Sequence, residues 1–139
     1  MNSLPKEFTE RMRRQLGVEL PDFLRALEEK PVRGIRMNRW KPFSGMEIYL
    51  SGERIPWTGD GYYLPADSSA GATVFHEAGA FYLQEPAAMM PAEVLNPQPG
   101  ERILDLCAAP GGKSTQIGLK MNGEGLLVCN EPVPNGRRS

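Results

Sequence analysis

The stretch from Ile103 to Glu131 limits the possible folds of this 139-residue chain more than any other. The run from Ile103 to Leu106 is apolar except at Asp105 and predicts a buried strand. A turn of small residues follows it, and then a helix that we expect to run from Lys113 to Met121. A second apolar run, Leu126 to Cys129, predicts another strand. This order of strand, glycine turn, helix and strand predicts an α/β unit that binds a nucleotide-type ligand.

Acidic residues flank the predicted turn, which lies at the carboxyl end of the first strand. Backbone N–H groups at the start of the following helix attract negative ligand groups, and the glycines allow close approach. Asp105 precedes the turn, and Glu131 follows Gly112 by 19 positions. An acid about 20 residues after a glycine turn accepts the ribose hydroxyls in nucleotide-type cofactor sites. We therefore expect a ligand that carries adenosine.

Three kinds of nucleotide-type ligand compete for this turn. Residues Cys107 to Ser114 read C-A-A-P-G-G-K-S, which departs from the phosphate-binding pattern G-x-x-x-x-G-K-[ST] because Cys107 replaces its first glycine. That substitution counts against ATP or GTP. No G-x-G-x-x-G spacing follows, which weakens the case for NAD. The sequence favours the third ligand, S-adenosylmethionine.

Two segments resemble one family. Asp105 to Lys113 is similar to the cofactor motif of the Sun-type RNA 5-methylcytosine methyltransferases, and Gly79 to Met89 resembles the segment that precedes that motif. The resemblance extends from about Pro31 to Pro134. It implies the start of a Rossmann-like domain that binds the methyl donor, preceded by a small α+β N-terminal domain.

The resemblance also implies the cofactor, the substrate and the site. The cofactor would be S-adenosylmethionine and the substrate RNA, expected to be ribosomal. Lys113 would favour the methionine carboxylate, Glu131 would accept the ribose hydroxyls, and the segment from Gly79 to Met89 would lie beside the pocket. The implied cofactor-binding residues are Cys107, Ala108, Ala109, Pro110, Gly111, Gly112, Lys113 and Glu131.

Methylation of cytosine carbon 5 requires a cysteine thiolate that adds to carbon 6. The family resembled places its cysteines in Pro-Cys and Thr-Cys motifs, and this sequence contains neither pair. Cys107 occupies a cofactor-contact position, and we expect Cys129 to be buried in its apolar strand. The resemblance therefore predicts an N-terminal fragment, without catalytic residues, that transfers no methyl group on its own.

The N-terminal part holds the basic surplus of the chain. Residues 1–59 contain eleven Lys or Arg and eight acids, whereas residues 60–139 contain five and nine. The densest cluster of basic and aromatic residues is Arg33, Arg36, Arg39, Trp40 and Lys41. Basic groups neutralise phosphates and an aromatic plane stacks an unpaired base, so this cluster is a candidate RNA contact. In the alternative interpretation Trp40 is a core residue and the arginines are solvated.

Periodicity predicts the other elements. Two helices are expected near the N-terminus, and a strand from Val32 to Asn38 has Ile35 and Met37 on one face. The remaining predictions are strands at Met46–Leu50, Tyr62–Leu64 and Gly79–Leu83 and a helix at Glu85–Leu95. The small polar stretch from Ala66 to Thr73 predicts a domain boundary, which gives domains at residues 1–73 and 74–139.

Composition adds bounds on compartment and partners. The two cysteines of a chain without an export signal or long apolar span indicate reduced thiols and a cytoplasmic protein. A single His argues against a metal site. An unpaired sheet edge at Leu126–Cys129 would favour a homodimer. Two other functions remain open: a non-catalytic RNA-binding module, and a P-loop nucleotide-binding protein.

Overall fold

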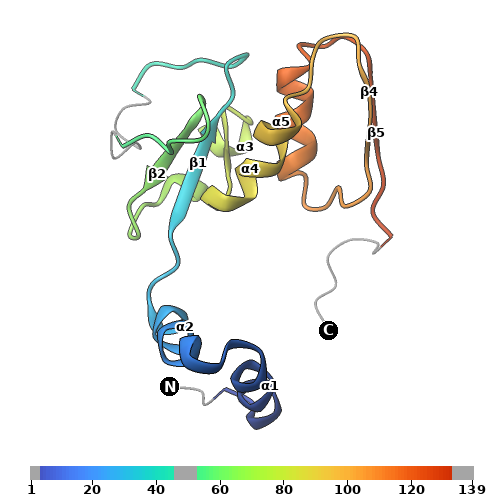
Figure 1. The fold of residues 1–139 in the computed structure, drawn as a ribbon. Helices are drawn as coiled ribbons and strands as arrows, with labels where there is room; N and C mark the ends of the chain where they lie inside the picture. Colours follow the sequence, from blue (N-terminus) through green and yellow to red (C-terminus); the bar gives the residue numbers. More distant parts are fainter. Residues whose placement is uncertain (1–3, 46–52, 133–139) are drawn as a thin grey trace. The chain divides into compact units, whose positions relative to one another are not determined.

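A computed structural model describes residues 4–45 and 53–132, and the chain divides into two compact units, residues 1–31 and 32–139. The first unit is helical (Figure 1), with α1 (Lys6–Leu16), a short 3-10 helix η1 (Gly17–Glu19) and α2 (Leu20–Glu28). The rings of Phe8 and Phe23 pack with centroids 6.3 Å apart and hold α1 against α2. The two helices expected near the N-terminus are confirmed.

The second unit begins with a three-stranded antiparallel sheet in the order β2-β1-β3 (Figure 1). The strands are β1 (Arg33–Met37), β2 (Gly61–Leu64) and β3 (Phe81–Leu83). Central β1 pairs on both sides, so that Ile35 faces Tyr62 in β2 and Leu83 in β3. These strands confirm three of the predictions, and the strand predicted at Met46–Leu50 lies outside the described residues.

One face of this sheet supports a hydrophobic core. Because side chains alternate along a strand, Ile35 and Met37 point into this core and Arg36 points to the opposite face. The rings of Phe43 and Phe75 stack at 4.2 Å beside it. Two short elements that follow β2, η3 (Ala70–Ala72) and α3 (Val74–Glu77), cover this side. The buried core residues are Ile35, Met37, Leu64, Ala70, Ala80 and Phe81.

The opposite face of the sheet packs against the segment that contains the predicted nucleotide-type unit. Helix α4 (Pro86–Leu95) contacts β1 and β2, and α5 (Gly112–Lys120) packs on α4. Beyond α5 lie β4 (Arg102–Asp105) and β5 (Leu126–Cys129), which pair in parallel. The two helices therefore lie between the two sheets (Figure 1). A second core joins Ala92, Ile117 and Met121 to the half-buried Ile103 and Leu127.

Three sequence predictions of burial are wrong. Leu104 and Leu106 are 59% and 60% exposed, and Cys129 is also exposed. Both faces of a parallel sheet are usually covered. Among the described residues, α4 and α5 cover only the face that carries Ile103 and Leu127, so Leu104 and Leu106, which alternate with Ile103, point outward. Cys129 shares the face of Leu127 but ends β5, outside the cluster that packs on the helices.

The sheet takes strands from both sides of the predicted domain boundary, because β3 follows residues 66–73 and pairs with β1. The division at residues 1–73 and 74–139 stays a prediction. No helix within residues 4–45 and 53–132 is long and apolar enough to cross a membrane.

Candidate functional site

The turn between β4 and α5 closes over the carboxyl ends of both parallel strands. The ladder continues past the strands, since Asn130 N donates to the Asp105 carbonyl at 2.8 Å and Ala108 N donates to the Asn130 carbonyl at 3.2 Å. Asp105 and Glu131 are thereby brought to the same edge of the sheet. Ligands of open α/β sheets bind outside this edge.

Asp105 holds the turn together. Its carboxylate is buried, accepts the Cys107 N–H at 3.0 Å, and accepts the Ser114 hydroxyl at 2.6 Å. Hydrogen bonds to an ionised carboxylate are short and strong. Asp105 therefore ties the end of β4 to the first turn of α5.

Glu131 reaches the turn from the end of β5. Its Oε2 accepts the Ala109 N–H at 3.1 Å, although the two residues lie 22 positions apart in the sequence. The side chain is partly exposed. The structure thus brings Glu131 to the glycine turn, as the spacing predicts, while its contact with a ribose stays a prediction.

Two glycines shape the start of α5. Gly111 caps the helix with φ +109°, a conformation that side chains disfavour. A Cβ on Gly112 would lie 3.3 Å from the Gln84 side-chain amide and 3.4 Å from the Tyr82 ring. A side chain at position 112 would therefore require Gln84 and Tyr82 to shift, so glycine favours the close approach of the turn to β3.

This close approach brings together the two segments that resemble the family. The Tyr82 hydroxyl donates to the Pro110 carbonyl at 3.0 Å. A cavity of about 180 Å³ lies between the segments. Its walls are Tyr82, Leu83, Gln84, Glu85 and Ala88 on one side and Cys107, Ala109, Pro110, Gly112 and Lys113 on the other.

Gln84 brings an uncompensated polar atom to this cavity. Its side chain is buried, and Nε2 donates to the Ala88 carbonyl at 2.9 Å. Its Oε1 has no hydrogen-bond partner among the described residues. A buried acceptor without a partner is costly, which makes Oε1 a candidate ligand contact.

Arg36 has a different place from the one the sequence suggests. It is 2% exposed, and its guanidinium donates to the Gly112 carbonyl at 2.8 Å and to the Thr115 hydroxyl at 2.7 Å. Burial lowers the pKa of Arg36 to about 10, against the opposing charges of Tyr82, Asp60 and Glu93. Arg36 therefore holds α5 against β1. The strand pattern already placed it opposite Ile35 and Met37.

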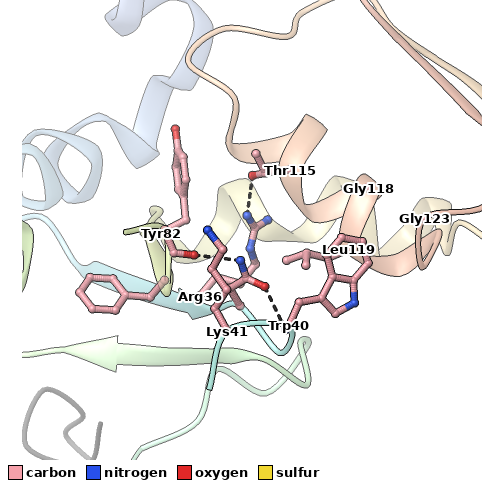
Figure 2. A pocket seen from close by; sticks show the side chains of 11 residues that line it. Arg36, Trp40, Lys41, Tyr82, Thr115, Gly118, Leu119 and Gly123 are labelled. Carbon is pink, nitrogen blue, oxygen red and sulfur yellow. Dashed lines mark hydrogen bonds between the residues drawn. The ribbon is translucent and has the colours of Figure 1, made fainter. Parts of the chain in front are cut away.

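The rest of the basic cluster divides into two places. Arg33 donates to the carbonyls of Ala66 and Ser68 at 3.0 and 3.1 Å, and it is not among the described residues that line the pocket drawn in Figure 2. Arg39 and Lys41 are exposed, and Trp40 is 52% exposed, which rules out the alternative in which Trp40 is a core residue. Arg36, Trp40 and Lys41 line one pocket of about 530 Å³.

A polar cluster centred on Glu93 escaped the sequence reasoning. Its carboxylate accepts hydrogen bonds from Thr58 at 2.9 Å, Gln116 at 2.8 Å and Lys120 at 2.7 Å. The Gln116 amide also donates to the Met89 carbonyl at 3.1 Å. This cluster joins α4, α5 and the segment before β2. Because the residues are far apart in sequence, their spacing gave no signal.

Both thiols are free and exposed. Cys107 lines the cavity at the turn, as its expected cofactor-contact position requires. Cys129 ends β5 at the same edge of the sheet. No group of three residues suited to hold a metal ion occurs in the described part of the chain.

Fold and site together define the class of this protein: it contains the first strand–turn–helix–strand unit of a Rossmann-like methyltransferase domain. Residues 4–86 match the N-terminal domain of the 16S rRNA methyltransferase RsmF, and residues 92–138 match the 16S rRNA methyltransferase RsmB/F family. The chain belongs to this family of 16S rRNA methyltransferases. The resemblance to Sun-type RNA methyltransferases is confirmed.

Curated relatives carry the name ribosomal RNA small subunit methyltransferase F. The protein of Pectobacterium atrosepticum is 38% identical over 144 residues, which cover 93% of this chain and 30% of that protein. The protein of Vibrio campbellii is 35% identical over 143 residues, with coverages of 92% and 30%. The chain thus spans about 30% of the length of these relatives.

Solved structures share the fold. A methyltransferase homologue from Pyrococcus horikoshii is 28% identical with a TM-score of 0.74, covering 91% of this chain and 44% of the other. A second solved chain is 27% identical with a TM-score of 0.77, covering 94% and 31%. The predicted α/β, Rossmann-like class is confirmed.

Proposed function

We propose that this chain forms the N-terminal part of an S-adenosylmethionine-dependent RNA cytosine-C5 methyltransferase that acts on ribosomal RNA. The observation that carries the proposal is the contact between the Glu131 carboxylate and the Ala109 N–H across the glycine turn. This contact puts an acid at the carboxyl ends of β4 and β5, next to the cavity that the two family-like segments share.

The charges at the turn fit a methyl donor better than a nucleotide phosphate. In phosphate-binding loops the backbone N–H groups are available to the anion. Here the N–H groups of Cys107 and Ala109 already donate to the carboxylates of Asp105 and Glu131. Two carboxylates beside the turn repel a triphosphate and favour the positive sulfonium of S-adenosylmethionine.

We assign the holding of the cofactor to residues of the turn and of β5. Glu131 accepts the ribose hydroxyls, and Lys113 attracts the methionine carboxylate. Gln84 Oε1, the buried acceptor without a partner in the described part of the chain, is available to a donor group of the ligand. When bound, the cofactor supplies an electrophilic methyl group. The full proposed set is Cys107, Ala108, Ala109, Pro110, Gly111, Gly112, Lys113 and Glu131.

The cavity at the turn is a partial site. Its volume of about 180 Å³ is below the roughly 300–1,000 Å³ typical of small-molecule pockets. The sequence lacks the Pro-Cys and Thr-Cys pairs of the family's nucleophiles. We therefore expect the purified 139-residue chain to form no 5-methylcytosine in RNA. Digestion of the RNA and mass spectrometry of its nucleosides checks this expectation.

We place RNA contacts on Arg39, Trp40 and Lys41, which are consecutive in the sequence and all exposed. Cations there neutralise phosphates, and the open indole stacks on a base. Arg33 and Arg36 also belong to the sequence cluster, but their guanidinium groups donate to backbone carbonyls within the fold. Arg36 holds α5 next to these exposed residues through its hydrogen bonds to Gly112 and Thr115.

Calorimetric titration of the folded chain tests the cofactor assignment. S-adenosylhomocysteine is the ligand, and ATP with magnesium is the control. We expect heat of binding with the first and none with the second. Binding of ATP alone would contradict the methyl-donor assignment and favour the P-loop alternative. Binding of neither ligand would also contradict it and leave an RNA-binding module as the better description.

A further inference from the structure

A second pocket is larger than the proposed cofactor cavity and separate from it. It has a volume of about 530 Å³ and lies where the end of β1, β3 and α5 meet (Figure 2). We call it the Trp40 pocket. Among its lining residues are Trp40, Lys41, Phe81, Tyr82, Thr115 and Leu119. Of these lining residues in the described part of the chain, only Tyr82 also lines the cavity at the glycine turn.

The position of the pocket along α5 separates it from the donor site. Leu119 lies seven residues after Gly112, which is about 10 Å along a helix. The end of the pocket at Gly118 and Leu119 is therefore distant from the glycine turn, whereas Thr115 at its other end lies three residues after Gly112.

The wall of the pocket offers an open aromatic plane. The Trp40 indole is 52% exposed, and its backbone is fixed because Trp40 N donates to Asn38 Oδ1 at 3.0 Å. Leu119 lines the same pocket (Figure 2). A fixed aromatic ring beside an apolar surface is the arrangement on which proteins stack unpaired bases.

The rim of the pocket is positively charged. Arg39 donates to the Leu119 carbonyl at 3.2 Å, and Lys41 donates to the Ala78 carbonyl at 2.7 Å, so both cations are held at the edge. An ammonium and a guanidinium each have further donors, which stay available to an anion. No carboxylate occurs among the described lining residues.

The floor of the pocket adds to this positive potential. Arg36 lies there, and its Nε–H has no hydrogen-bond partner in the part of the chain that the structure describes. Its other guanidinium nitrogens donate to protein acceptors, and the charges of Asp60 and Glu93 act on it. Arg39 and Lys41 at the rim therefore carry most of the attraction for phosphate. A protein segment in the pocket would have to desolvate these cations, whereas an RNA strand brings phosphates to them.

We propose that the Trp40 pocket takes one unpaired nucleobase of the RNA strand, stacked on Trp40, with the adjoining phosphate at Arg39 and Lys41. The inference rests on the proposed RNA methyltransferase function and deepens it. The pocket holds a nucleotide that flanks the methylated one, and so fixes the register of the strand. Its volume lies within the roughly 300–1,000 Å³ of sites that enclose small ligands.

The test compares a base-containing strand with a base-free strand. Fluorescence anisotropy measures binding of a short labelled oligouridylate, and of an abasic strand of equal length, to the 139-residue chain. Trp40→Ala removes the stacking plane, Trp40→Phe keeps it, and Trp57→Phe is the control outside the pocket. We expect Trp40→Ala to weaken oligouridylate binding on the order of tenfold, and the other two variants to change it little.

The abasic strand should bind weakly and show no dependence on Trp40. If Trp40→Ala lost the same affinity for both strands, the proposal would be overturned, because contacts to phosphate alone would then explain the binding. Equal oligouridylate affinity of Trp40→Ala and the unchanged chain would also overturn it and leave the pocket to a protein segment. Near-ultraviolet circular dichroism checks the fold of each variant.

A second readout needs no substitution in the pocket. The chain contains two tryptophans, so in Trp57→Phe all tryptophan emission comes from Trp40. Oligouridylate should quench this emission, and an absence of quenching at saturation would overturn the proposal. S-adenosylhomocysteine binding, measured in parallel, reports on the proposed function separately. If the chain binds S-adenosylhomocysteine but its RNA binding does not depend on Trp40, only the assignment of the Trp40 pocket is overturned.

Discussion

The guanidinium of Arg36 donates to the carbonyl of Gly112 at 2.8 Å, across 76 positions of sequence. This bond joins the central strand of the antiparallel sheet to the first residue of α5. The helix start that forms the candidate donor site is therefore held by a strand of the preceding sheet. The position and stability of the turn therefore depend on the antiparallel sheet as well as on the β4–α5–β5 segment.

Replacing Arg36 should unfold this junction. Arg36→Ala removes a buried guanidinium and leaves the half-buried Gly112 carbonyl and the Thr115 hydroxyl without this donor. We expect the free energy of unfolding to fall by about 1–3 kcal/mol. Urea denaturation followed by circular dichroism measures this change. Arg39→Ala is the matched control, because Arg39 is exposed and donates to the Leu119 carbonyl at 3.2 Å. Equal stability of the two variants would contradict the structural role of Arg36.

The Glu93 cluster should make stability depend on pH. Burial acts to raise the pKa of Glu93, but hydrogen bonds from Lys120, Thr58 and Gln116 and the charge of Lys120 outweigh it, so the pKa falls below its usual 4.5. The unfolded chain then binds more protons than the folded chain near that pH. The stabilisation of the fold by ionised Glu93 is therefore complete above about pH 4.5, and it is lost as the pH falls through the folded-state pKa.

Glu93→Gln should remove this part of the pH dependence. The variant keeps an acceptor but has no charge to titrate. We expect its stability to fall less steeply than that of the unchanged chain as the pH is lowered below about 4.5. Thermal unfolding at a series of pH values gives the comparison, with the exposed Glu124→Gln as control. Parallel curves for Glu93→Gln and the unchanged chain would refute this assignment.

The outward face of the β4–β5 pair should drive self-association. Leu126 and Val128 are each 46% exposed on β5, beside the exposed Leu104. Apolar patches and unpaired strand edges favour association. Sedimentation velocity should show association that rises with concentration and is reduced in Val128→Lys. Leu127→Lys, on the covered face, should instead lower stability. A monomer at all concentrations would rule out the predicted homodimer.

Local patterns predicted most elements of this fold. The run from Leu126 to Cys129 gave the bounds of β5, and Pro86 marked the first turn of α4. The offset between Gly112 and Glu131 also placed the acid at the turn correctly. These features depend on neighbours in sequence, or on the fixed geometry of a strand–helix–strand unit.

Burial was less accessible to sequence reasoning because it depends on what packs against each face. Leu104 has apolar neighbours, yet it lies on the side of β4 and β5 that α4 and α5 do not cover. Cys129 also follows apolar residues, but it is the last residue of β5 and lies outside the cluster that packs on the two helices. Arg36 stands among exposed basic residues in the sequence, but β1 is the central strand and is covered on both faces. The Glu93 cluster joins residues from distant segments, so no local sequence pattern could predict it.

The most direct test of the donor site is the affinity of Glu131 variants for S-adenosylhomocysteine. Titration calorimetry compares the unchanged chain with Glu131→Ala, Glu131→Gln and the control Glu124→Ala. We predict that Glu131→Ala weakens binding on the order of tenfold, because hydrogen bonds to a charged acceptor are lost. Glu131→Gln should weaken it less, and Glu124→Ala should leave it unchanged. Equal affinity of Glu131→Ala and the unchanged chain, both folded, would contradict the assignment of Glu131 to the ribose.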